Sequence, residues 1–132
     1  MAAGELLAGR LFCRYSMSLS SPTIEVTTTE ASKKLEGTEA SRRPLLLDCR
    51  TAEEHGIAKI EGAVLIPMQE LAARLSELEP WRDKPIIVHC HHGVRSLRVT
   101  HFLREKGFSQ AQSMKGGIDA WSVEVDPSVP RY

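Results

Sequence analysis

The stretch of sequence that decides the fold reads Ile86-Ile87-Val88-His89-Cys90-His91-His92-Gly93-Val94-Arg95-Ser96. The β-branched, apolar run before Cys90 is bounded by Pro85 and Gly93, which predicts a short buried strand. Ser96 is a candidate capping residue for a helix whose apolar side chains turn inward, namely Leu97, Val99, Phe102 and Leu103. A cysteine between a strand's carboxyl end and a helix's amino end meets backbone N–H groups and a positive dipole, which stabilise thiolate. Cys90 is therefore the candidate reactive residue.

The composition is that of one ordinary globular domain, with 132 residues, 42% of them hydrophobic and 26% charged. Seventeen basic and seventeen acidic side chains cancel, so the net charge gives no reason to expect nucleic acid or an anionic membrane as a partner. No apolar stretch approaches the ~20 residues that cross a bilayer. Positive charge gathers only locally, around Cys90, in His89, His91, His92, Arg95 and Arg98.

The three cysteines are odd in number and form no Cys-x-x-Cys pair, which favours a reducing compartment over a disulfide framework. We expect Cys49 to be an inert, small apolar residue that ends a central strand, and Cys13 to be an exposed thiol without a role. Residues 1–21 are predicted to be a disordered extension, followed by one domain over residues 22–132. The expected location is cytoplasmic. The alternative is that residues 1–21, rich in Ala, Leu, Ser and Arg, target the chain to an organelle.

Short apolar runs predict strands over residues 45–49, 63–66 and 86–90, an alternating pattern predicts one over 24–27, and a further short strand is expected near 112–114. Helical patterns separate these runs, among them an amphipathic helix over residues 69–78. Most of the runs are unbroken in apolar character, as strands covered on both faces are. We therefore predict an α/β fold with a mainly parallel central sheet flanked by helices on both faces. Ligand sites of such sheets lie beyond the carboxyl ends of the strands, where Cys90 is expected.

Collinear signatures over about residues 23 to 125 resemble those of rhodanese-homology domains. They are Leu47-Asp48-Cys49-Arg50 with Glu53-Glu54, Ile60-Glu61-Gly62-Ala63 with Ile66-Pro67, Cys90-His91-His92-Gly93-Val94-Arg95-Ser96 followed by Gly107-Phe108, and Gly116-Gly117-Ile118-Asp119-Ala120-Trp121. Two positions depart from the family pattern. Ala58-Lys59-Ile60 stands where the family has Gly-His-Ile, and Cys49 replaces a more usual apolar residue. The resemblance implies a rhodanese-like fold.

The resemblance also implies a single-domain sulfurtransferase. In that family the loop cysteine, here Cys90, takes a sulfane sulfur from a donor such as thiosulfate and forms a persulfide. It then passes the outer sulfur to a thiophilic acceptor such as cyanide or a thiol, with a protein thiol as a further candidate. The reaction implies neither a metal nor an organic cofactor.

The substrate-binding loop that the resemblance implies comprises His91, His92, Gly93, Val94, Arg95 and Ser96. Its backbone N–H groups are expected to form a cradle for the persulfide and for the anionic end of the donor. Gly93 is expected to supply a positive backbone angle. Arg95 is expected either to bind the donor's anionic end or to pair with a nearby acid. The two histidines either line the pocket mouth or are solvated.

Asp48 and Arg50 are expected to support the loops at the sheet's edge through hydrogen bonds or an ion pair. A metal site over His89-Cys90-His91-His92 is not favoured, because adjacent strand residues point to opposite faces and no pair has the spacing typical of ligands. The chain therefore carries no expected metal ligand.

Two other functions are weighed against sulfur transfer. The first is a non-catalytic binding module, which the retained Cys90 disfavours because inactive members of such families commonly lose the cysteine. The second is a phosphatase or arsenate reductase of the same fold. Only four residues separate Cys90 from Arg95, whereas the related phosphatases have a longer loop that wraps a phosphate.

Overall fold

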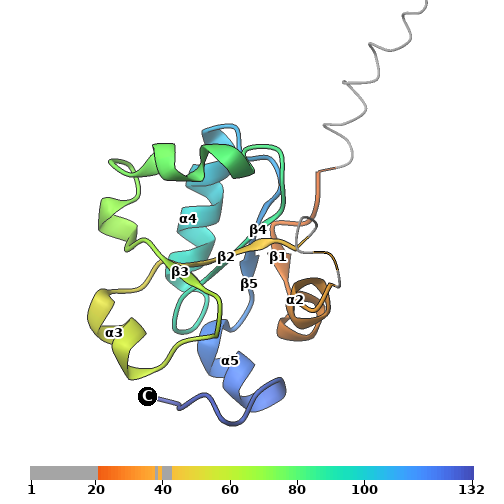
Figure 1. Ribbon diagram of the computed structural model, residues 1–132, viewed down its shortest axis with the longest axis vertical. Helices are drawn as coiled ribbons and strands as arrows, with labels where there is room; N and C mark the ends of the chain where they lie inside the picture. Colours follow the sequence, from red (N-terminus) through yellow and green to blue (C-terminus); the bar gives the residue numbers. More distant parts are fainter. Residues whose placement is uncertain (1–20, 38, 40–42) are drawn as a thin grey trace, which may run out of the picture.

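The computed structural model describes residues 21–37, 39 and 43–132 (Figure 1). The predicted N-terminal extension lies outside the described residues except for Ser21, and so does Cys13. Within the described part of the chain, no helix has the length and apolar character needed to cross a membrane.

In the described part of the chain, five parallel strands form a single sheet in the order β1-β5-β4-β2-β3. The strands are β1 (Glu25–Val26), β2 (Leu45–Asp48), β3 (Val64–Leu65), β4 (Ile86–His89) and β5 (Ala111–Met114). β4 lies between β2 and β5, and its register with β2 places Asp48 beside His89. The predicted α/β fold with a parallel central sheet is confirmed.

Helices and helical turns cover both faces of the sheet (Figure 1). One face packs against α4 (Val94–Glu105) and two 3-10 segments, η2 (Met68–Glu70) and η3 (Leu75–Trp81). The other packs against α2 (Thr28–Leu35) and α5 (Gly117–Glu124), while α3 (Ala52–Ile57) follows β2. Strand side chains alternate between the two cores. Leu45, Leu47, Ile86 and Val88 join the α4 side, and Leu46 and Ile87 join the α5 side.

Capping residues set the starts of the first helices. Thr27 caps α2 and forms a reciprocal capping box with Glu30, and Thr51 forms the same box with Glu54 at α3. α4 begins differently, because Gly93 precedes it in the left-handed conformation and supplies no side-chain cap. The expectation that Ser96 caps this helix is wrong. Ser96 lies inside the first turn, and its hydroxyl meets that of Ser113 at 2.7 Å.

Two further expectations about elements are wrong. The amphipathic segment over residues 69–78 forms no α-helix and contributes instead to η2 and η3. Its apolar face is nevertheless correct, since Leu71 and Leu78 are buried. The third strand is not buried, because β3 is a two-residue strand at the edge of the sheet and Val64 is 43% exposed.

Candidate active site

Cys90 lies immediately after β4, at the carboxyl edge of the sheet, and is only 1% exposed. Its sulfur accepts hydrogen bonds from the backbone N–H groups of Gly93 at 3.0 Å and Ser96 at 3.3 Å. The Ser96 hydroxyl is 3.5 Å from the same sulfur. Gly93 has φ 103°, which an L side chain rarely adopts, and this angle turns the chain from the loop into α4. The arrangement concentrates N–H donors on one sulfur atom.

The amino end of α5 donates hydrogen bonds to the backbone of this loop. The N–H of Ile118 donates to the Cys90 carbonyl at 2.9 Å, and the N–H of Asp119 donates to the His91 carbonyl at 3.1 Å. Gly117 makes this approach possible, because a Cβ atom there would lie 2.4 Å from the His91 carbonyl oxygen. The loop carbonyls are therefore occupied by a helix end.

Arg95 is paired with an acid of α3. Its two terminal nitrogens meet the two carboxylate oxygens of Glu54 at 2.7 and 2.9 Å. Hydrogen bonds from Arg95, assisted by Tyr132 and the Thr51 N–H, hold the pKa of Glu54 well below its usual range. Of the two roles expected for Arg95, the structure therefore shows the pairing with a nearby acid.

Asp48 and Arg50 form a fully buried ion pair beside the loop. The guanidinium meets the carboxylate at 2.9 and 2.7 Å through Nε and Nη2, and Nη2 also donates to the Ala58 carbonyl at 2.6 Å. His55 is 2.8 Å from the same carboxylate. Burial alone would raise the pKa of Asp48, but the hydrogen bonds from Arg50 and the interactions with both neighbouring histidines outweigh it, so the pKa is lowered.

His89 is buried on the Asp48 side of the sheet. Its Nε2 atom is 4.0 Å from the Asp48 carboxylate and has no hydrogen-bond partner among the described residues, while Nδ1 lies 3.4 Å from the Cys90 carbonyl oxygen. Burial lowers the pKa of His89 to about 4, although Asp48 acts in the opposite direction. The imidazole is therefore neutral near pH 7.

Tyr132 connects the last described residues to the loop. Its ring stacks on His91, with centroids 3.9 Å apart and the planes 6° from parallel. Its hydroxyl accepts from Arg50 at 2.8 Å and donates to Glu54 at 2.9 Å. The neighbouring Arg131 pairs with Asp119 at 2.9 Å. Two adjacent residues thus contact α3, α5, the loop and the buried ion pair.

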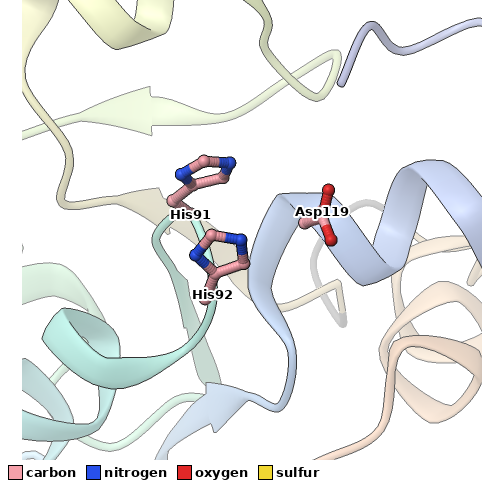
Figure 2. A group of neighbouring side chains, drawn as sticks. All are labelled: His91, His92 and Asp119. Carbon is pink, nitrogen blue, oxygen red and sulfur yellow. The ribbon is translucent and has the colours of Figure 1, made fainter. Parts of the chain in front are cut away.

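Figure 2 shows the described side chains that come nearest to a metal-ligand set. His91 and His92 come from the loop and Asp119 from the start of α5, and one ligand atom of each lies within 4.8 Å of the others. The two imidazoles stack at 3.9 Å, and Asp119 is engaged by Arg131. Two imidazoles and a carboxylate are donors suited to Zn²⁺. Sequence spacing gave no hint of this group, because Asp119 reaches it only through the docking of α5.

The predicted site residues lie around Cys90 but differ in how exposed their side chains are. His91 is half-buried, whereas His92 is exposed and the Val94 side chain points into solvent at 65% exposure. Asp48 and Arg50 lie at the adjoining end of β2. Sequence reasoning assigned no role to Glu54, Gly117 or Tyr132. Their contacts with the site span up to 82 positions, and no local pattern reports such contacts.

The fold and this geometry define an α/β protein that places a buried cysteine in a loop whose backbone N–H groups point at the cysteine sulfur. Comparison with known proteins makes the class specific. A family model described as the rhodanese-like domain matches residues 27–124. The chain belongs to the rhodanese-like domain family, as its signatures predicted.

Individual relatives agree with this assignment. A protein of Allochromatium vinosum named "Sulfurtransferase" is 31% identical over 105 residues, which cover 80% of this chain and 94% of that protein. The adenylyltransferase and sulfurtransferase MOCS3-2 of Zea mays is 39% identical over 93 residues, which cover 67% of this chain. That match spans only 19% of the maize protein. Both relatives thus carry the word sulfurtransferase in their names.

Solved structures share the fold. A rhodanese-like domain protein from Staphylococcus aureus superposes with a TM-score of 0.69 at 28% identity, covering 83% of this chain and 99% of that one. A human single-domain sulfurtransferase superposes with a TM-score of 0.66 at 25% identity, covering 78% of this chain and 98% of that one.

Proposed function

We propose that this domain transfers sulfane sulfur through a persulfide on Cys90. The Cys90 thiolate attacks the outer sulfur of a donor such as thiosulfate, the S–S bond of the donor breaks, and sulfite leaves with the bonding pair. A thiophilic acceptor, cyanide or a thiol, then attacks the terminal sulfur and regenerates the thiolate. The single observation that carries the proposal is the aim of the Gly93 and Ser96 N–H groups at the Cys90 sulfur.

Those N–H groups stabilise negative charge where the reaction needs it. The thiolate and the persulfide are both anions, and fixed backbone donors bind them without reorganisation during the reaction. We assign the loop from His91 to Ser96 to this cradle. The positive end of α4 adds to the same field, since Val94–Glu105 begins right at the loop.

Arg95 holds the loop to α3 in this proposal. A donor's anionic end would have to displace Glu54 from both terminal guanidinium nitrogens before it could bind there in the same way. Asp48 and Arg50 form a buried ion pair that supports the carboxyl edge of the sheet beside the loop. The proposed acceptor is a small thiol, cyanide or a protein thiol, and no nucleic acid or membrane is needed.

The test is the mass of the intact protein after mixing with thiosulfate. The parent should gain one sulfur, roughly 32 mass units, that dithiothreitol removes. Cys90→Ser should show neither the gain nor turnover with cyanide, while Cys13→Ser and Cys49→Ala should show both.

Three outcomes would overturn the proposal. Full sulfur transfer by Cys90→Ser would place the chemistry on another residue. Hydrolysis of aryl phosphates by the parent, lost in Cys90→Ser, would make the domain a phosphatase. A folded parent that takes up no sulfur from any sulfane donor and hydrolyses nothing would favour the binding-module alternative.

The cytoplasmic location stays a prediction. One relative, 30% identical over 120 residues, is named as the chloroplastic rhodanese-like/PpiC domain-containing protein 12 of Arabidopsis thaliana. Import of a fluorescent fusion carrying residues 1–21 into an organelle would overturn it.

A further inference from the structure

The strand register makes Cys49 a lateral neighbour of Cys90. Asp48 of β2 pairs with His89 of β4, and each cysteine directly follows its member of that pair. The Cys49 N–H donates to the His89 carbonyl at 3.1 Å, which extends the ladder by one step. Neighbouring parallel strands lie about 4.8 Å apart, within the window of roughly 4.4–6.8 Å that disulfides need between Cα atoms.

Both cysteines also point to the same side of the sheet. They follow Leu47 and Val88 by two residues, and all four side chains belong to the core on the α4 side. Each cysteine is 1% exposed. Asp48 and His89 lie between these positions and point to the opposite side. Both sulfur atoms therefore lie on the same side of the sheet, on neighbouring strands in register.

The two thiols have unlike surroundings. The Cys49 sulfur lies 3.5 Å from the His89 carbonyl oxygen and donates to it, whereas the Cys90 sulfur receives N–H donors from its loop. Burial, then the nearby Cys90 and Asp48, raise the pKa of Cys49 to about 12. Cys49 therefore stays protonated and leaves sulfur transfer to Cys90, so the proposed reaction does not use it.

We propose that Cys49 is a resolving thiol that forms a reversible disulfide with Cys90 when the site is oxidised by a hydroperoxide. The Cys90 thiolate attacks the peroxide, the O–O bond breaks, an alcohol or water leaves, and Cys90 becomes a sulfenic acid. The Cys49 thiol gives its proton to the sulfenic oxygen as its sulfur attacks the Cys90 sulfur, the S–O bond breaks, and the oxygen leaves as water. An external dithiol reduces the disulfide to two thiols and is itself oxidised.

This inference rests on the proposed reactivity of Cys90 and adds protection to it. A sulfur bonded to Cys49 carries no thiolate charge, so sulfur transfer stops until reduction. Without a neighbouring thiol, further oxidation would carry the sulfenic acid on to sulfinic acid, which dithiols do not reverse.

The test uses the full chain in a Cys13→Ser background, so that Cys49 and Cys90 are the cysteines left. One equivalent of hydrogen peroxide should abolish sulfur transfer, remove both titratable thiols and give a cross-linked peptide joining Cys49 to Cys90. Dithiothreitol should restore the activity.

Cys49→Ala is the matched control, with Cys49→Val as a second variant that suits a strand; thermal unfolding confirms that each is folded. Both should transfer sulfur at the parent rate before oxidation. After excess peroxide and dithiothreitol, the recovered activity should be roughly tenfold lower than in the parent, with Cys90 found as sulfinic acid.

The inference is overturned if no cross-linked peptide forms, or if the variants recover as fully as the parent. Its failure is separable from that of the proposed function. Persulfide uptake without a disulfide removes only the role of Cys49. A disulfide in a protein that takes up no sulfur removes only sulfur transfer.

Discussion

A single buried imidazole gives the fold a measurable dependence on pH. Burial lowers the pKa of His89 to about 4, whereas a histidine side chain ordinarily has a pKa of 6.5. Between about pH 4 and pH 6.5, His89 is protonated in the unfolded chain but neutral in the folded chain. Stability is therefore present above about pH 6.5 and falls as the pH drops toward 4.

Urea unfolding at several pH values checks this dependence. His89 contributes a slope of up to ~1.4 kcal/mol per pH unit, because one proton is exchanged. His91 adds in the same direction, since burial and the neighbouring His92 lower its pKa as well. His89→Val should flatten the slope, and Val123→Ala, at an exposed position on α5 without a titratable group, should leave it unchanged. An unchanged slope in His89→Val would contradict a neutral, buried His89.

At the scale of elements, the contact between the loop and α5 depends on one missing side chain. Gly117 has φ 63°, and an added Cβ would lie within 2.6 Å of the carbonyl oxygens of Cys90 and His91. Both obstacles are backbone atoms, so α5 and the loop would have to separate.

Gly117→Ala should therefore lower both stability and sulfur transfer. The backbone angle alone costs on the order of 1–2 kcal/mol, and the steric overlap adds to it. Gly62→Ala is the matched control, because Gly62 has φ 88° but nothing within 4 Å of its added Cβ. Denaturant unfolding and turnover should separate the two variants. Equal losses would show that the approach of α5 to the loop is not tight.

The sequence predicted the site-bearing elements better than the segment between β3 and β4. β4, the loop and α4 follow from an apolar run, a glycine and a helical pattern within a few residues. Leu71, Leu75 and Leu78 are spaced by four and three residues, which an α-helix and successive 3-10 turns share. The spacing therefore predicts which face of the segment is buried, but it does not distinguish an α-helix from 3-10 turns. The Arg95–Glu54 and Tyr132–His91 contacts depend on tertiary folding, so no local pattern predicts them.

At the scale of the whole molecule, Tyr132 contacts both the loop that follows Cys90 and residues far from it in the sequence. Tyr132→Phe keeps the stacking on His91 but removes the hydrogen bonds with Arg50 and Glu54. Tyr132→Ala removes both. Bonds to charged groups contribute roughly 1.5–3 kcal/mol, and the partial exposure of Tyr132 places its contribution at the lower end.

The free energy of unfolding should therefore fall in the order parent, Tyr132→Phe, Tyr132→Ala. Amide hydrogen exchange of the loop should quicken in the same order, because His91 loses its stacking partner only in Tyr132→Ala. Val123→Ala, at an exposed position of α5, serves as the control. Exchange that is equally slow in all variants would show that the loop is held without Tyr132.

The alternation of side chains along β2 and β4 makes the central sheet a partition between two chemistries. At the carboxyl ends of these strands, the carboxylate of Asp48 and the imidazole of His89 lie on one side, and the sulfur atoms of Cys49 and Cys90 lie on the other. A slip of one residue exchanges the faces of a strand. The effect of inserting or deleting residues in β4 therefore depends on whether their number is odd or even. An odd shift would present imidazole to the loop and sulfur to the buried ion pair, whereas an even shift would leave each chemistry on its own side.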